Sequence, residues 1–207
     1  MMYFTRNIYK KMQIRGEFPL RVDDKDKWMK QWEEFYNLCH AKKDKEFKAW
    51  VFQHIPEVKD DILQGKKFTD KEVVEKLYKR MKEMAYEWKT VCKMCQAEHE
   101  EIKHKLPLNM QTLINLNLHD SIVLSIKKDS NNMLNIELDR YSLTFKDVSR
   151  LEITDDIVGD SLLYKEVHLS DMGKFDFQVL FCSSQVVLTL HEFRVIADDV
   201  VIESKIW

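Results

Sequence analysis

The stretch CKMCQAEHEEIKH, residues 92–104, contains the residue types that bind transition metals or exchange disulfides. Cys92 and Cys95 are three residues apart, and His99 follows four residues later. Thiolate sulfur and imidazole nitrogen are the usual ligands of zinc. A CxxC pair is also the motif of thiol oxidoreductases. The segment is therefore the first candidate for a metal or redox site.

The position of these side chains inside a long predicted helix weakens that hypothesis. A reactive dithiol has its first sulfur at a helix N-terminus, where the dipole lowers the thiol pKa, and Cys92 lies far from such an end. A buried free cysteine behaves as a small hydrophobic residue. We therefore expect Cys92 and Cys95 to pack as ordinary core residues. The alternative is a metal site at Cys92, Cys95 and His99, to which Cys39 and His40 could add ligands from a neighbouring helix.

Three histidines in the C-terminal half lie beside carboxylates, a combination that can bind a metal or act as acid and base. The pairs are His119 with Asp120, Glu166 with His168, and His191 with Glu192. Adjacent residues of a strand point to opposite faces of the sheet, so only Glu166 and His168 share a face. We expect these polar positions to lie on a solvated sheet face. Glu166 and His168 remain an alternative metal site.

The sequence lacks the signatures of most large enzyme superfamilies. Its four glycines, at positions 16, 65, 159 and 173, are far apart, whereas loops that bind phosphate need clustered glycines. This excludes a P-loop, a dinucleotide-binding turn and a kinase glycine-rich loop. No GxSxG, HExxH or EF-hand motif occurs either. We predict no catalytic residue and no cofactor.

The charge balance and the spacing of apolar residues both change near Leu106 and Pro107. Residues 1–107 contain 24 Lys and Arg against 19 Asp and Glu, whereas the remainder contains 9 against 16. Apolar residues recur at helical spacing before this point and alternate after it. We predict an α+β protein with an α-helical domain at residues 1–106 and an antiparallel β domain at residues 107–207.

One long helix dominates the predicted helical half. Thr69 and Glu72 form a capping-box pattern, and no helix breaker follows before Pro107. An earlier helix is expected to begin at Asp23 or Asp24. Along the long helix an apolar stripe predicts a face that packs into a core. Its members are Leu77, Met81, Met84, Trp88, Val91, Cys95, Ile102 and Leu106.

The C-terminal half is predicted to form six to seven short strands. Runs such as SIVLSIKK, SLTFKDVSRLEI and KFDFQVLFC are each predicted to form one strand, and turn sequences such as KDSNN and SDMGK separate the strands. Close spacing of short strands is typical of an antiparallel β sandwich or a partly open barrel.

Composition indicates a soluble cytoplasmic protein. Four scattered cysteines fit free thiols in a reducing compartment, and we find neither a signal peptide nor a membrane span. Four tryptophans in the basic half raise the possibility of nucleic-acid binding. They fall on apolar stripes, however, and lysines alternate with acids, so we expect no such binding.

Several short motifs resemble an uncharacterised bacterial family of small cytosolic proteins from Bacillus-like organisms, described as a domain of unknown function. These motifs are the opening YFT, a first helix rich in Trp and Tyr, LHDS at residues 118–121 and LLYKEVHL at residues 162–169. The resemblance covers essentially the whole chain and implies no activity or cofactor. LHDS is also similar to segments of some bacterial toxin-immunity proteins.

Two functions remain open from the sequence. The first is a non-enzymatic module that binds another protein, for which an inhibitory or immunity-like role is one form. Its support is the lack of catalytic motifs and the opposite charges of the two halves. The second is a metal-dependent enzyme that uses the His and acid residues of the β half or the Cys and His cluster of the helical half.

Overall fold

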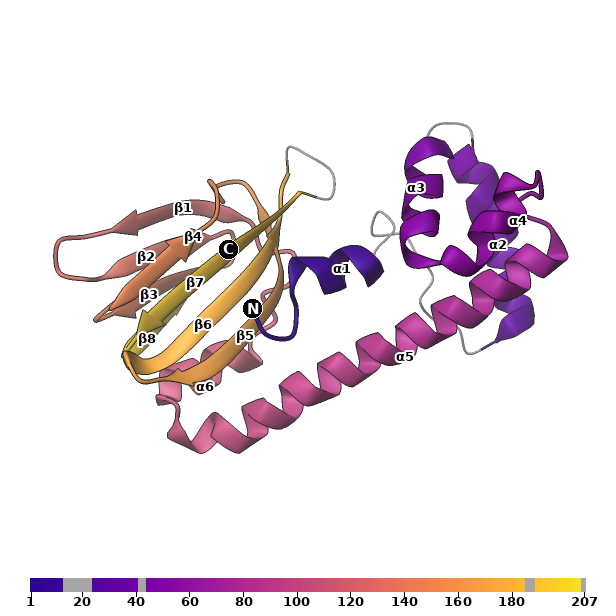
Figure 1. Ribbon diagram of the computed structural model, residues 1–207. Helices are drawn as coiled ribbons and strands as arrows, with labels where there is room; N and C mark the ends of the chain where they lie inside the picture. The colour runs from indigo at the N-terminus through magenta and orange to yellow at the C-terminus, as the bar shows by residue number, and fades with distance from the viewer. Residues whose placement is uncertain (13–23, 41–43, 185–188, 206–207) are drawn as a thin grey trace. The chain divides into compact units, whose positions relative to one another are not determined.

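The computed structural model describes residues 1–12, 24–40, 44–184 and 189–205. The chain divides into two compact units, Tyr9–Thr90 and a second unit made of Met1–Ile8 with Val91–Trp207. The predicted α+β class is confirmed, since helices, including one long helix, fill the N-terminal half and antiparallel strands the C-terminal half (Figure 1). The domain limits 1–106 and 107–207 stay a prediction.

Short helices precede the long one. They are α1 (Arg6–Met12), α2 (Lys25–His40), α3 (Asp44–His54), a 3-10 turn (Pro56–Val58) and α4 (Lys59–Leu63). The predicted start of α2 is confirmed, because the Asp24 carboxylate accepts backbone N–H bonds from Asp26 and Lys27 at 3.0 and 3.1 Å. Inside this unit Trp28 stacks on Trp32, with ring centroids 5.4 Å apart.

The long helix α5 (Lys71–Ile102) begins differently from the prediction. The Asp70 carbonyl accepts the N–H of Val74, so Asp70, not Thr69, is the residue that precedes the helix. The Glu72 carboxylate binds Lys66 Nζ at 2.6 Å instead of completing a capping box. The apolar side chains of the predicted stripe are buried or half-buried. The prediction that this face of α5 packs into a core is therefore confirmed.

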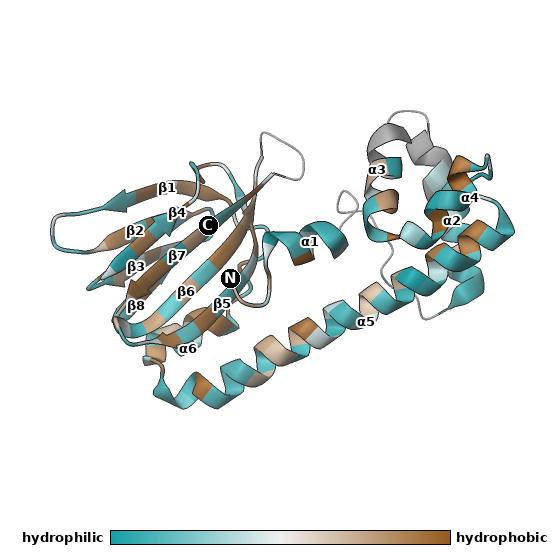
Figure 2. Cartoon of the chain, viewed as in Figure 1, coloured by the Kyte–Doolittle hydropathy of each residue, from teal (hydrophilic) through white to brown (hydrophobic). Residues whose placement is uncertain are grey.

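Brown hydrophobic positions recur along α5 between teal ones, as Figure 2 shows. A short 3-10 turn (Lys103–Lys105) and helix α6 (Leu108–Asn115) follow it. No helix in the described part of the chain is both long enough and apolar enough to cross a lipid bilayer.

In the described part of the chain, eight strands form two four-stranded antiparallel sheets, one more strand than the upper limit predicted. The first sheet contains β1 (Val123–Lys128), β2 (Leu134–Leu138), β3 (Tyr141–Lys146) and β8 (Asp199–Ser204). The second has the order β4 (Arg150–Ile153), β7 (Leu190–Ala197), β6 (Gly173–Cys182) and β5 (Ser161–Ser170).

The extra strand arises where one predicted segment divides in two. The sequence SLTFKDVSRLEI reads as one strand, but Asp147 has a positive φ of 53° and turns the chain out of the first sheet. Residues before the turn pair with β8, and residues after it pair with β7. Aspartate tolerates this left-handed conformation better than most residues, which is why the turn needs no glycine.

The two sheets pack face to face around one hydrophobic core. Phe145 of the first sheet stacks on Phe177 of the second, with ring centroids 5.7 Å apart. Met110 and Leu113 of α6 are fully buried in the same core. Since one face of the β4-β7-β6-β5 sheet is used by this core, its other face is left for polar side chains.

Candidate functional site

A row of polar side chains crosses the outer face of the β4-β7-β6-β5 sheet. Glu152 pairs with Arg194, Arg194 with Gln178, and Gln178 with Glu166. Paired residues on neighbouring antiparallel strands project to the same face. The register therefore places these four side chains, one from each strand, side by side.

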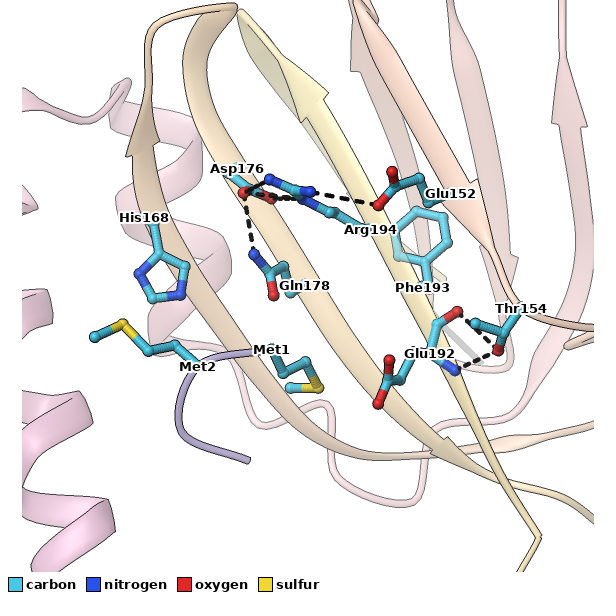
Figure 3. A pocket seen from close by; sticks show the side chains of 10 residues that line it. All are labelled: Met1, Met2, Glu152, Thr154, His168, Asp176, Gln178, Glu192, Phe193 and Arg194. Carbon is cyan, nitrogen blue, oxygen red and sulfur yellow. Dashed lines mark hydrogen bonds and ion pairs between the residues drawn. The ribbon is translucent and has the colours of Figure 1, made fainter. Parts of the chain in front are cut away.

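A pocket of about 450 Å³ lies over this row (Figure 3). Strands β5, β6 and β7 and the end of β4 contribute most of its lining, and the N-terminal segment contributes two methionines. The lining residues are Met1, Met2, Glu152, Thr154, His168, Asp176, Gln178, Glu192, Phe193 and Arg194.

Glu166 anchors the N-terminal segment to β5. Its side chain is fully buried, and its carboxylate accepts the successive backbone N–H groups of Met2, Tyr3 and Phe4 at 2.8, 2.9 and 2.5 Å. Consecutive N–H groups form a concave anion site. Burial acts to raise the pKa of Glu166, but hydrogen bonds from His168 and these N–H groups outweigh it, so the pKa is lowered.

His168 lies between two carboxylates. Its Nε2 is 3.1 Å from Glu166 and its Nδ1 is 2.7 Å from Glu98 on α5. Because carboxylates accept and do not donate, both ring nitrogens carry a proton. The hydrogen bond to Glu166, and then that to Glu98, raise the pKa of His168 against the effect of burial. These contacts therefore favour the imidazolium form, in which both ring nitrogens donate and no lone pair is free for a metal.

One of the two cysteines of α5 faces a histidine. Cys95 Sγ is 3.9 Å from His99 Nε2, and that nitrogen accepts the backbone N–H of Val167 at 3.3 Å. Burial lowers the pKa of His99 and raises that of Cys92. Burial, followed by the charges of two nearby glutamates, raises the pKa of Cys95 to about 12. Both thiols are protonated near neutral pH, which makes them poor metal ligands and poor nucleophiles.

The two alternative sets of site residues meet in one place. His99 binds the backbone of Val167, which stands between Glu166 and His168 in β5. The link between the sets is Glu98, which sequence reasoning missed. Within the described ranges, no three His, Cys, Asp or Glu residues are grouped so that they could hold a metal ion. The side chains of Cys39 and His40 lie outside those that the structure describes.

Of the other two histidines, one contacts the adjacent acid and the other contacts an acid elsewhere in the chain. His119 and Asp120 contact each other at 3.0 Å because Asp120 lies in a turn with a positive φ of 63°. His191 hydrogen-bonds Asp160, with Nδ1 and Oδ2 2.6 Å apart, and not the adjacent Glu192. Only Glu166 and His168 contact each other across one face of a strand, as their spacing predicts.

Asp176 and Arg194 form a two-bond ion pair on the pocket wall. Arg194 Nε is 3.0 Å and Nη2 is 2.7 Å from the Asp176 carboxylate. Arg194 Nη1 also contacts Glu152 at 3.4 Å. The Asp176 carboxylate accepts a further bond from the side-chain amide of Gln178 at 3.0 Å. The guanidinium is therefore held by acids on two sides.

We expect replacement of His168 by glutamine to change how stability depends on pH. The raised pKa of His168 means that its stabilising contribution is complete below the ordinary value of 6.5 and is lost as pH rises through the raised value. The wild type should therefore lose more stability than His168→Gln in urea denaturation as the pH rises above about 6.5. The matched control is His119→Gln, at an exposed position, and equal slopes in all three proteins would contradict the prediction.

Cysteine labelling should follow burial. We expect iodoacetamide to modify Cys95 far more slowly in native buffer than in denaturant, because the thiolate is the reactive form and its pKa is raised to about 12. Mass spectrometry of the peptides measures each cysteine separately. Labelling of Cys95 in native buffer at the denatured rate would show that it faces solvent.

Comparison with known proteins gives one match. A model of a family described as a protein of unknown function, DUF4085, matches residues 3–191. Curated proteins and solved structures gave no match. The predicted resemblance to a domain of unknown function is thus confirmed over nearly the whole length. The chain belongs to the DUF4085 family.

Proposed function

We propose that this protein is a non-enzymatic module that binds another protein, with an inhibitory or immunity-like role as one form of that binding. The observation that carries the proposal is the state of His168. Its two ring nitrogens lie 2.7 and 3.1 Å from Glu98 and Glu166, so both nitrogens of the one imidazole that lines the pocket are engaged by carboxylates of the protein itself. General acid–base catalysis needs a group that can exchange its proton with a substrate.

The remaining charged groups of the pocket support the same proposal. Arg194 is held by Asp176 and Glu152, and Glu192 is 3.2 Å from Arg6. Charged side chains that bind one another present a fixed shape and hydrogen-bonding groups to a partner. They do not provide a free nucleophile. Such prearranged polar groups favour specificity in protein recognition.

A metal-dependent enzyme is the second candidate, favoured by the contacts that join Cys95 to His99 and His99 to the β5 backbone beside His168, although among the described residues no three such side chains are grouped to hold a metal. To bind a metal there, His168 would have to lose a proton and break its hydrogen bond to one of the two glutamates. Metal analysis of untagged protein separates the two functions. Zinc near one equivalent that is lost in both Cys95→Ala and His168→Ala would support the enzyme, and its retention in both variants would contradict a site in this cluster.

Affinity purification of the full chain from its native host tests the proposed function. We expect one stoichiometric protein partner to be recovered. Failure to recover any partner across several growth conditions would contradict the proposal. A bacterial cytoplasmic setting, without binding to membranes or nucleic acid, is part of the same proposal.

A further inference from the structure

The two cationic side chains that line the pocket already bind carboxylates. His168 donates both N–H groups to glutamates, and Arg194 donates to Asp176 and Glu152. Once these donors are paired with acids, a ligand finds few N–H groups to bind. The pocket must therefore recognise a ligand mainly through acceptors.

Gln178 supplies an acceptor at the base of the pocket. Its residue surface is only 8% exposed, and its amide nitrogen donates to Asp176 at 3.0 Å. A carboxylate accepts only, so this bond fixes which end of the amide is nitrogen. The carbonyl oxygen is turned away from Asp176, toward Met1, in Figure 3. No donor among the described residues binds it, so this oxygen is open to a ligand in the pocket.

Two acceptors of the pocket are open to a ligand, and one of them is charged. Five carboxylates line the pocket or hold its lining, against four cationic side chains and the N-terminal ammonium of Met1, so the formal charges balance. The carboxylates belong to Glu98, Glu152, Glu166, Asp176 and Glu192, and the cations to Arg6, Arg150, His168 and Arg194. Glu192 uses one carboxylate oxygen for Arg6, and its second oxygen has no partner in the described part of the chain. These two free acceptors, one of them a carboxylate oxygen, complement an N–H donor with a positive charge.

We propose that this pocket binds a basic side chain, lysine or arginine, of the protein partner, with Gln178 Oε1 and Glu192 as the acceptors. This inference rests on the proposed function, because the basic group belongs to a protein. The pocket volume of about 450 Å³ lies within the range of about 300–1,000 Å³ that is typical of small-ligand sites. One long side chain with its cationic end on Gln178 fits within such a volume.

NMR titration of the full chain with three capped amino acids tests the inference. The probes are Nα-acetyl-arginine methylamide, Nα-acetyl-lysine methylamide and the uncharged Nα-acetyl-citrulline methylamide. We expect one or both cationic probes to shift amide signals around Gln178 and Glu192, and citrulline to shift none. The preferred cationic probe identifies the basic side chain.

Two pocket variants and one control complete the experiment. Gln178→Leu should weaken binding of the preferred probe about tenfold or more, as expected for loss of a hydrogen bond to a charged group. Glu192→Gln, at a partly exposed position, should weaken it even if Gln178→Leu disturbs folding. Glu203→Gln on exposed β8 is the control and should bind like the wild type. If no amide signal shifts at 50 mM probe, the inference is overturned. It is also overturned if both pocket variants bind the preferred probe as tightly as the wild type does.

Failure of the inference can be told apart from failure of the proposed function. A stoichiometric partner that is recovered equally by the wild type, Gln178→Leu and Glu192→Gln would overturn this site and leave the proposed function intact. Binding of a cationic probe in the pocket, with no partner ever recovered, would support the site and contradict the proposed function.

Discussion

Replacing Glu166 with alanine is expected to lower the free energy of unfolding of the β unit by about 3–5 kcal/mol, the usual cost of removing one partner from a buried ion pair. The substitution leaves three backbone N–H groups and the imidazolium of His168 without their acceptor. Urea denaturation measures the loss of stability, and hydrogen exchange of peptides from β5 and β6 assigns the loss to this unit.

The matched control is Glu203→Ala, which removes an exposed carboxylate from β8 of the same unit. We expect its effect to be within about 0.5 kcal/mol, as is usual for a surface substitution. Exchange in residues 1–8 should rise most in Glu166→Ala, because this carboxylate binds the backbone of that segment. An effect of Glu166→Ala no larger than that of the control would show that Glu166 does not hold the segment in solution.

Replacing Phe177 with alanine should also destabilise the β unit by about 3–5 kcal/mol, the range for aromatic truncation in a packed core. Phe177 is buried between the two sheets and stacks on Phe145. Truncation leaves a cavity that the strands of two sheets cannot easily fill. The same hydrogen-exchange measurement reports the change, and here it should spread over both sheets.

Two comparison variants define the origin of that loss. Phe177→Leu keeps most of the volume and should cost clearly less than alanine. Leu169→Ala removes an apolar side chain from a position of β5 that is 41% exposed and should cost little. Equal losses in Phe177→Ala and Leu169→Ala would mean that the space between the sheets is not the centre of the core.

Local pattern was sufficient for much of the fold. The spacing of Leu77, Met81 and Met84 identifies the buried face of α5, because a helix brings residues three and four apart to one side. Alternation of apolar and polar residues likewise identifies most strands. The division at Asp147 was missed, since a single aspartate in the left-handed conformation leaves no Gly or Pro signal in the sequence.

For the site, the two-residue period of a strand is enough to predict that Glu166 and His168 share a face. The partners of these two side chains depend on tertiary packing. Glu98 is 70 residues from His168, and the N–H groups that bind Glu166 are more than 160 residues away. Such contacts arise when separate elements pack together, so no periodicity or local motif encodes them. The CxxC spacing alone suggests a metal site. The same packing, however, buries Cys95 and His99, which raises the pKa of the thiol and lowers that of the imidazole.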